Sequence, residues 1–148
     1  MKRVGVVGLV LVGMLSVCAS AQTKPRVVLE TNFSDILIEL YPEDAPITVD
    51  NFLGYANSGF YDYLLFHRVI ENFMIQGGGY YLDGSIVRPR PPGDPIINES
   101  YNGLSNLRGT IAMARTPEPN SATSEFFINH VGNQDDLDRD GSDSDGFG

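Results

Sequence analysis

Apolar and polar residues alternate in several short stretches of the chain. Residues 26–32 and 34–46 predict two strands joined by a turn at residues 32–34. In the second of these strands Ile36, Ile38 and Leu40 alternate with other residues, which is the period of two of a half-buried strand. The N-terminal part of the fold is therefore expected to begin with a pair of strands.

One segment, residues 45–59, has the spacing of an amphipathic helix. Pro46 suits the first turn of a helix, and Gly59 suits the position just past its end. The apolar stripe of this helix consists of Val49, Phe52, Leu53 and Ala56. The sequence therefore predicts a helix after the first two strands, with one face turned to a core.

The rest of the chain predicts further strands and a long loop region. Residues 64–70 and 73–78 predict two strands, and residues 110–115 and 125–130 predict two more, on either side of the connection 116–124. Residues 79–109 are dense in Gly, Pro and Asn and are expected to form loops. One helix with roughly seven short strands favours a mainly β barrel or sandwich.

The first 21 residues resemble a signal peptide, so we divide the chain into a signal peptide at 1–21 and one domain at 22–148. Lys2 and Arg3 precede a short apolar run, and Ala19-Ser20-Ala21 has the small residues of a cleavage site. An uncleaved N-terminal anchor helix is the alternative, and lipid attachment at Cys18 is disfavoured by the branched Val17 before it. An exported protein, periplasmic or secreted, is expected.

Removal of residues 1–21 leaves 8 basic and 19 acidic residues, a net charge of −11, and no cysteine. A chain this acidic has no basic stripe for phosphates, so nucleic acid is not an expected partner. No second apolar segment is long enough to span a membrane. The domain must fold by its hydrophobic core without disulfides.

The common catalytic motifs do not occur in the chain. The domain has no thiol nucleophile, no G-x-S-x-G elbow and no G-x-x-x-x-G-K-[ST] loop. His67 and His130, the two histidines, lack the spacing of a metal site. Gly77-Gly78-Gly79 follows a strand but leads into Tyr80-Tyr81 rather than a helix, so a phosphate loop is not expected. The sequence predicts no cofactor and no metal.

The acidic C-terminal stretch, residues 133–148, leaves weak calcium binding as a minor alternative. Asp136, Asp138, Asp140 and Gly141 match the start of a calcium-loop pattern. Phe147 stands where that pattern needs a bidentate Glu, and no flanking helices are predicted. A solvated acidic loop is the favoured interpretation.

Arg68 lies within an otherwise apolar predicted strand, which raises the question of what it contacts. Alternation places Phe66, Arg68 and Ile70 on one face and His67 and Val69 on the other. An exposed edge-strand arginine is the ordinary explanation. The uncharged residues nearby, such as Met74 and Gln76, instead favour a cleft for a neutral ligand rich in carbonyls, such as a peptide.

The stretches "FHRVIENFMIQGG" and "GTIAMARTPEPNSATSEFFIN" resemble the two signature blocks of the cyclophilin-type peptidyl-prolyl cis-trans isomerases, in particular the exported bacterial branch. The similarity runs from about Val27 to Leu137. It implies a closed eight-stranded antiparallel β-barrel capped by two helices, with a peptide groove outside. It also implies a monomer whose partners are proline-containing and unfolded exported polypeptides.

The resemblance also implies roles for particular residues. Arg68 matches the family's catalytic arginine, and Gln76 matches the glutamine that holds this arginine and the substrate. Ala114 and Arg115 fall where main chain runs along the peptide, and His67 lies beside the groove. Phe73, Met74 and Phe127 match the wall of the proline pocket, and Leu137 matches its outer lip. Phe73 is counted with Arg68 and Gln76 as catalytic, and Phe126 is also expected to bind substrate.

Rotation of an X–Pro bond needs none of the missing reactive groups, because no covalent bond is made or broken. Its barrier of about 18–20 kcal/mol comes from amide resonance, which is lost in the twisted state. The prolyl nitrogen then gains a usable lone pair, which Arg68 can hydrogen-bond. A thousandfold acceleration needs only about 4 kcal/mol of such stabilisation.

Three features depart from the family pattern. Glu125 stands where a glutamine is usual, and Asp136 stands where an aromatic residue is usual. The chain also stops at Gly148, where the family continues into further strands and a second helix. We therefore expect a fragment of a longer protein, with an incomplete C-terminus. A non-catalytic module that binds proline-containing peptides remains the alternative function.

Overall fold

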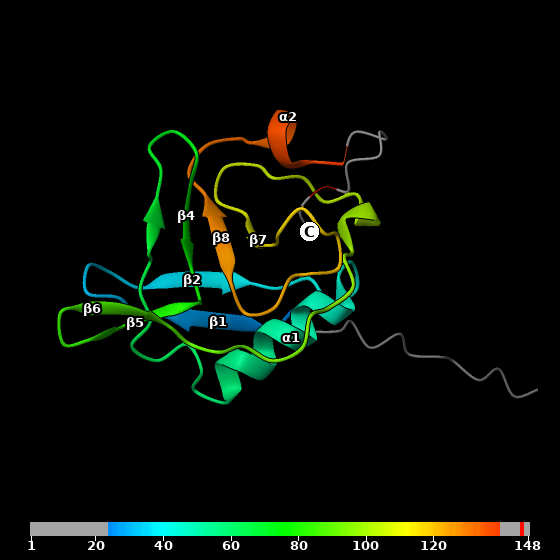
Figure 1. Cartoon of the computed structure of the whole chain (residues 1–148). Coiled ribbons are helices and arrows are strands. Elements are labelled where there is room, and N and C mark those ends of the chain that lie inside the picture. Colours follow the sequence, from blue (N-terminus) through cyan, green and yellow to red (C-terminus); the bar gives the residue numbers. More distant parts are fainter. Residues whose placement is uncertain (1–23, 140–145, 147–148) are drawn as a thin grey trace, which may run out of the picture.

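The computed structural model of the chain describes residues 24–139 and residue 146 (Figure 1). The predicted signal peptide at 1–21 lies outside these residues. So do Asp140, Gly141 and Phe147 of the acidic stretch. Within the described ranges no helix has the combination of length and apolar character that crossing a bilayer requires.

The N-terminal elements are a hairpin and a helix, as predicted. Strands β1 (Arg26–Leu29) and β2 (Ile36–Glu39) pair antiparallel, and helix α1 (Pro46–Asn57) lies beside them (Figure 1). Ile38 and Leu40 pack against Val49 and Phe52 of the helix. Gly59 has a φ of 71°, a left-handed conformation that suits a residue following a helix end.

The start of α1 is satisfied by a residue far away in the sequence. Its N-cap, Ala45, has no side chain that can cap, and the helix offers none of its own. The buried carboxylate of Glu99 instead accepts the main-chain N–H groups of Ile47 at 3.2 Å and Thr48 at 2.8 Å. A negative charge at this position also favours the helix dipole. Glu99 therefore ties the long loop after residue 89 to the helix.

A four-stranded antiparallel sheet carries the signature blocks. Its strands are β3 (Arg68–Val69), β4 (Met74–Gly77), β7 (Ile111–Met113) and β8 (Phe126–Asn129), in the order β3-β4-β8-β7. Each lies within a stretch that the sequence predicts as a strand, although β3 is much shorter than the predicted 64–70. One face of this sheet packs on β2 and α1, and the other face packs under the C-terminal helix.

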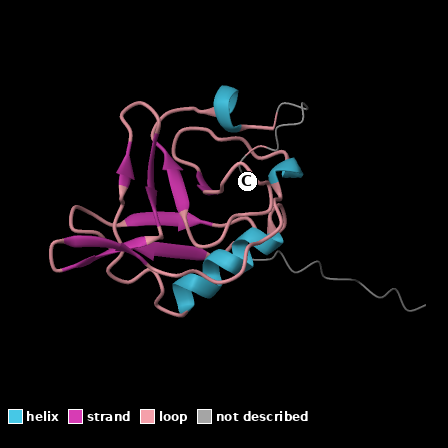
Figure 2. Cartoon of the chain, in the orientation of Figure 1, coloured by secondary structure: helices cyan, strands magenta, loops and turns pink. Residues whose placement is uncertain are grey.

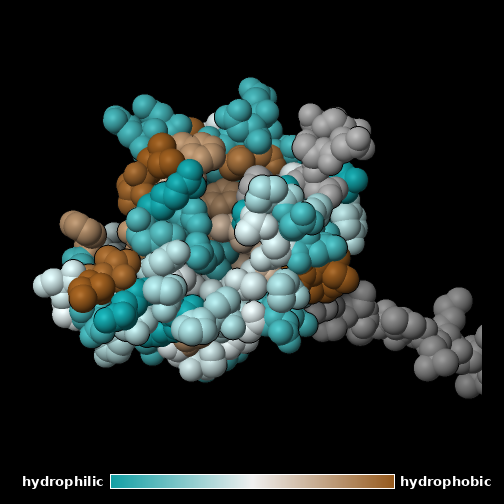
Figure 3. Space-filling model, in the orientation of Figure 1, coloured by the Kyte–Doolittle hydropathy of each residue, from teal (hydrophilic) through white to brown (hydrophobic). Residues whose placement is uncertain are grey.

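Four elements fall in segments that the sequence predicts as loops. Strands β5 (Tyr80–Asp83) and β6 (Ile86–Pro89) form a hairpin whose turn contains Gly84 at a φ of 64°. A 3₁₀ turn, η1 (Ser100–Asn102), and a short helix, α2 (Gln134–Leu137), are the others. Figure 2 shows how much loop still joins β6 to β7. Figure 3 shows apolar residues at the left of the molecule, where the β5–β6 hairpin projects.

The strand pairing differs from the closed barrel that we expected. The described residues contain eight strands, but these pair as three separate sheets: β1-β2, β3-β4-β8-β7 and β5-β6. Isolated bridges join Leu64 to Tyr81 and Ile96 to Ala122. Within this part of the chain no run of paired strands closes on itself. The fold is mainly β, and the closed eight-stranded barrel is not confirmed.

The main core contains a continuous cluster of aromatic rings. Phe126 of β8 makes edge-to-face contacts with Phe52, Tyr61 and Phe66, with ring centroids 5.4–6.1 Å apart. The Tyr61 hydroxyl donates to the main-chain oxygen of Ser124 at 3.0 Å. Burial raises the pKa of Tyr61 far above its ordinary value, and the nearby Tyr55 adds to this. These rings join the helix to the four-stranded sheet.

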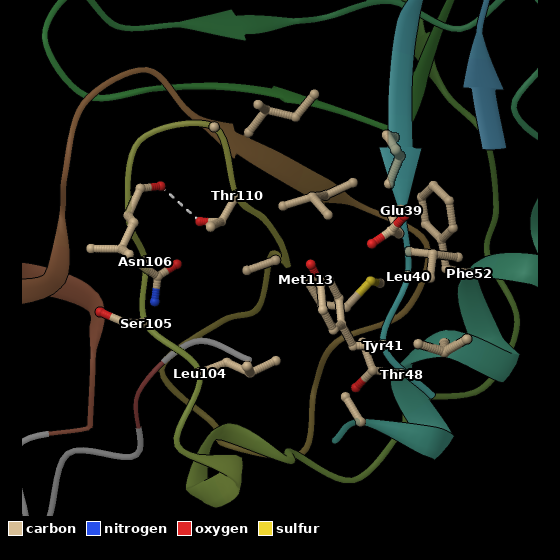
Figure 4. A pocket seen from close by; sticks show the side chains of 18 of the residues that line it. Glu39, Leu40, Tyr41, Thr48, Phe52, Leu104, Ser105, Asn106, Thr110 and Met113 are labelled. Carbon is tan, nitrogen blue, oxygen red and sulfur yellow. Dashed lines mark hydrogen bonds between the residues drawn. The ribbon is translucent and has the colours of Figure 1, made fainter. Parts of the chain in front are cut away.

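An apolar cavity of about 470 Å³ lies between β2, α1 and the segment 102–113 (Figure 4). Figure 4 shows Leu40, Phe52, Leu104 and Met113 directed toward it from these elements. In the pairing of the described strands, β2 and β7 each have an unpaired edge. None of the predicted site residues lines this cavity. It is therefore separate from the site that the sequence predicts.

Candidate functional site

The predicted site residues meet in a row across the four-stranded sheet. Arg68 pairs with Gln76, Gln76 with Phe127, and Phe127 with Ala112. Residues that lie directly opposite each other in neighbouring strands point to the same face. The row therefore places the arginine at one edge of the sheet and an apolar surface beside it.

The apolar part of the site is a compact cluster on the same face. Met74, Phe127, Ala112 and Leu137 are buried against one another, and Phe73 and Ala114 pack around them. Leu137, the last residue of α2, is 9% exposed and covers the strands from above. Phe73, Met74, Phe127 and Leu137 were all predicted to line the pocket, and the structure brings these four together.

Arg68 is exposed, because β3 is an edge strand and both of its residues face solvent. Its Nη1 donates to Oε1 of Gln76 at 3.2 Å. Among the hydrogen bonds between described residues this is the one that its side chain makes, so its other N–H groups can reach a ligand. The guanidinium of Arg68, which lies within an otherwise apolar stretch of sequence, is thus exposed to solvent and hydrogen-bonded to Gln76.

Gln76 connects the arginine to a carboxylate. Its Nε2 donates to Oε2 of Glu125 at 2.6 Å, and Nε2 of His67 lies 3.4 Å from the same oxygen. The His67 ring also contacts the Tyr80 ring, with centroids 4.4 Å apart, and its buried Nδ1 has no hydrogen-bond partner among the described residues. Arg68, Gln76, Glu125 and His67 therefore form a continuous polar chain beside the apolar cluster.

The three glycines after Gln76 allow close packing at this edge of the site. A side chain at Gly77 would contact Phe66, and one at Gly78, which has a φ of 88°, would overlap the main chain of Ser124. A side chain at Gly79 would overlap the carboxyl group of Glu125. The glycines therefore bring the chain against β8 and its preceding residues, and they make room for Glu125.

Two predicted residues, Ala114 and Arg115, follow the end of β7. The main-chain N–H of Ala114 donates to the main-chain oxygen of Glu125 at 2.8 Å, which extends the pairing with β8 by one residue. The Arg115 side chain turns back on its own loop and donates to the oxygens of Thr116 and Pro117. Ala114 therefore lies beside the apolar cluster, whereas the guanidinium of Arg115 is engaged away from it.

Phe126 is predicted to contact substrate, but the structure places its side chain outside the apolar cluster of the site. It pairs with Met113 and Gly77, one position along from Phe127, so its side chain points to the opposite face of the sheet. There it is 3% exposed within the aromatic cluster of the main core. Phe126 is therefore a core residue, contrary to the prediction that it contacts substrate. The reason is that adjacent residues of a strand point to opposite faces, and Phe127 occupies the site face.

A network of asparagines, which the sequence pattern does not predict, supports Phe73 and the end of β8. Nδ2 of Asn133 donates to the oxygen of Phe73 at 2.9 Å and to Oδ1 of Asn129 at 2.7 Å. Asn129 in turn donates to Asn106 and Thr110. All three asparagines are 4% exposed or less. Asn129 at the end of β8 and Asn133 before α2 are positions where a sequence suggests local capping. Their actual partners lie far away in the sequence, so the network could not be predicted from it.

Asp138 fastens α2 to the loop at 105–106. Its carboxylate accepts the Ser105 hydroxyl, the Asn106 main-chain N–H at 2.7 Å and the Asn106 side chain at 2.9 Å. Burial alone would raise the pKa of Asp138, but these hydrogen bonds together lower it below its ordinary value. This carboxylate, which the calcium-loop pattern counts as a ligand, is therefore occupied by protein donors.

No group of three or more metal-binding side chains occurs among the residues that the structure describes. Asp138 is hydrogen-bonded as above, and Asp136 lies in the helix α2 rather than in a loop. The other residues of the proposed calcium loop, from Asp140 onward, lie in the part of the chain outside the description except for Gly146. The described geometry therefore offers calcium no prepared site.

Comparison with known proteins agrees with this geometry. The sequence model of the family "Cyclophilin type peptidyl-prolyl cis-trans isomerase/CLD" matches residues 26–144. A peptidyl-prolyl cis-trans isomerase of Acinetobacter baylyi is 47% identical over 90% of this chain and 67% of its own length. Peptidyl-prolyl cis-trans isomerase B of Escherichia coli is 51% identical over 72% of this chain and 63% of its own length.

A solved structure has the same fold. The crystal structure of a Cryptosporidium parvum cyclophilin-type isomerase, determined in the presence of the dipeptide Ala-Pro, superposes with a TM-score of 0.64. It is 28% identical in sequence, and the match covers 83% of this chain and 73% of the other. The chain thus has a mainly β fold of the cyclophilin kind.

With the family model matching most of its length, the chain belongs to the cyclophilin-type peptidyl-prolyl cis-trans isomerases. It spans about two thirds of the length of the two bacterial relatives. The residues that carry the family resemblance, from Arg68 to Gln76 and from Ala112 to Phe127, are those that the sheet brings side by side.

Proposed function

We propose that this protein is a peptidyl-prolyl cis-trans isomerase that accelerates X–Pro rotation in polypeptides. The observation that carries this proposal is the cross-strand row, which places the exposed guanidinium of Arg68 at the edge of an apolar cluster containing Met74 and Phe127. Family membership and the names of the relatives support it. The Ala-Pro dipeptide named with the Cryptosporidium structure indicates the kind of ligand that a relative meets.

The chemistry follows from what the row offers. The apolar cluster holds the proline ring, while the carbonyl before it rotates. Midway through rotation the prolyl nitrogen becomes pyramidal, and an N–H of Arg68 donates to its lone pair. That hydrogen bond is absent in either planar ground state, so it stabilises the transition state selectively. No protein group needs to gain or lose a proton.

Gln76 restricts the guanidinium by accepting one of its N–H groups. A long, exposed arginine would otherwise sample many rotamers, and fixing it beforehand lowers the entropic cost of the transition state. The proposed roles are therefore donation by Arg68, orientation by Gln76, and ring binding by Phe73, Met74, Phe127 and Leu137.

The test is an isomerisation assay on an X–Pro peptide with wild-type protein and Arg68→Ala. We expect the variant to lose about a hundredfold in kcat/KM, the effect of about 2.7 kcal/mol of transition-state stabilisation. Lys24→Ala is the matched control, because it also removes an exposed cation but lies just before β1, beside Glu39 of the N-terminal hairpin. A change of less than twofold for Arg68→Ala would refute the mechanism.

A binding module without catalysis is distinguished in the same experiment. Such a protein would bind a proline-containing peptide with wild-type affinity in the Arg68→Ala variant and would not accelerate rotation in either form.

We further propose that the protein is exported, acts as a monomer on unfolded exported proteins, and has its strands closed into an eight-stranded barrel. Cell fractionation, sedimentation and a crystal structure test these three statements.

A further inference from the structure

The polar chain behind Arg68 contains a residue, Glu125, to which the proposed mechanism gives no role. Its carboxylate is buried to about two thirds, with 30% of the side chain exposed, and lies beside the sheet row rather than in it. It accepts Nε2 of Gln76 at 2.6 Å, a short, charge-assisted hydrogen bond. This carboxylate is thus linked to Arg68 through the glutamine between them.

Glu125 and Arg68 together set the direction of the two hydrogen bonds of Gln76, because an ionised carboxylate only accepts and a guanidinium only donates. An amide group has one end that donates and one that accepts, and it can be turned by 180° with little change in shape. An ionised carboxylate can only accept, so the donating end of Gln76 must face Glu125. The accepting end, Oε1, then faces Arg68, as the 3.2 Å contact shows.

The packing around the carboxylate keeps it in this position. Nε2 of His67 lies 3.4 Å from the same oxygen that Gln76 contacts. Gly79 leaves the space that the carboxyl group fills, since a methyl group there would come within 2.7 Å of Cγ and Cδ of Glu125. Gly79 has no positive φ, so an alanine at that position is permitted by the backbone.

We propose that Glu125 is a positioning residue for the isomerase: its carboxylate fixes the amide orientation of Gln76 and thereby holds the Arg68 guanidinium toward the substrate. This inference rests on the proposed function. It differs from a structural role of Glu125, because the effect passes only through Gln76 and Arg68. The proposal also predicts that residue 125 must be able to accept a hydrogen bond from Gln76, and that matching its size is not sufficient.

The test compares kcat and KM for Glu125→Ala, Glu125→Gln and Gly79→Ala. Glu125→Ala removes the acceptor, and we expect kcat to fall about tenfold with KM nearly unchanged, since Arg68 acts in the transition state. Glu125→Gln keeps an acceptor oxygen and should restore activity to within about threefold of wild type. Gly79→Ala retains the carboxylate but displaces it, so it should resemble Glu125→Ala. The matched control is Glu30→Ala, an exposed glutamate on the N-terminal side.

A double-mutant cycle separates positioning from stability. In an Arg68→Ala background, Glu125→Ala should have no further effect on kcat, because the group through which it acts is already missing. The NMR signals of the Gln76 side-chain amide provide a readout besides activity, and they should move in Glu125→Ala and less in Glu125→Gln.

Two results would overturn the inference while leaving the proposed function intact. One is wild-type kcat in Glu125→Ala, together with a strong loss in Arg68→Ala. The other is an equal loss from Glu125→Ala in the presence and absence of Arg68, which would show that Glu125 acts by another route. Failure of the proposed function itself would appear as no isomerisation by the wild-type protein.

Discussion

At the scale of single residues, the two adjacent phenylalanines of β8 have different surroundings. Phe126 packs among Phe52, Tyr61 and Phe66 in the main core, and Phe127 lies on the opposite face with Met74 and Leu137. Both are phenylalanines, and they are adjacent in the sequence. The alternation of strand side chains alone assigns one to the core and the other to the site.

This difference predicts opposite phenotypes for a matched pair of substitutions. Phe126→Leu loses edge-to-face contacts with three rings and should lower the free energy of unfolding by roughly 1–3 kcal/mol, with KM unchanged. Phe127→Leu should raise KM for an X–Pro peptide severalfold, with a smaller loss of stability. Thermal unfolding and steady-state kinetics of the two variants measure this, and the reverse assignment would contradict the packing.

Most residues of the site could be predicted from the sequence, but the hydrogen bonds between them could not. The family motif identifies Arg68, Gln76 and Phe127, but their pairing across neighbouring strands comes from the structure. The link from Gln76 to Glu125 joins positions 49 apart, and nothing in local spacing specifies it. The same holds for Asn133 and Phe73, which lie 60 apart. Such contacts are decided by how strands are placed beside one another, which periodicity does not encode.

At the scale of elements, prediction succeeded where side-chain pattern is strong. The β1–β2 hairpin, α1, β4, β7 and β8 all lie where alternation or helical spacing places them. The β5–β6 hairpin was missed because its surroundings are rich in Gly and Pro, although Gly84 after Asp83 is a hairpin signal. The helix α2 is only four residues long and very acidic, so it has no apolar period to recognise.

Helix α2 is held by a carboxylate, which makes its attachment dependent on pH. The pKa of Asp138 is lowered in the folded protein from its ordinary value of 3.8, despite the opposing effect of burial. A group whose pKa is lower in the folded state stabilises the protein above its ordinary pKa. That stabilisation is lost as the pH falls through the folded pKa.

Asp138→Asn should therefore lower Tm by a few degrees at pH 7, because charge-assisted hydrogen bonds to Ser105 and Asn106 are weakened. The difference in Tm between variant and wild type should shrink as the pH falls below about 4. Asp50→Asn, an exposed aspartate on α1, serves as the control. Equal Tm differences at pH 7 and pH 3 would show that Asp138 contributes by its shape rather than its charge.

At the scale of the whole molecule, the apolar cavity between β2, α1 and the segment 102–113 leaves part of the core open. Its walls include Ile38, Phe52 and Met113, which also belong to the main core. Apolar surface open to solvent is costly, and in soluble proteins a large exposed patch usually accepts a ligand or another chain segment. We therefore expect the folded protein to bind small apolar molecules in this cavity.

The fluorescent dye ANS should bind the native protein at neutral pH, before any unfolding. Leu104→Lys places a charge at the cavity wall and should weaken dye binding at least threefold, since a charge there opposes apolar contact. Leu82→Lys on the β5–β6 hairpin is the control, because Leu82 is similarly exposed at 54% against 48% for Leu104. Loss of binding in the control alone would place the dye on the hairpin instead.

The aromatic cluster around Phe126 has a practical consequence for optical measurements. The chain contains no tryptophan, so its near-ultraviolet circular dichroism arises from tyrosine and phenylalanine. Phe52, Tyr61 and Phe126 lie in fixed, tilted or edge-to-face pairs, which is the arrangement that gives such rings a chiral signal. Their signal reports the contact between helix and sheet. Arg68 and Glu125 contribute no aromatic ring, so a variant at either position that alters this spectrum has disturbed the packing of aromatic residues around it.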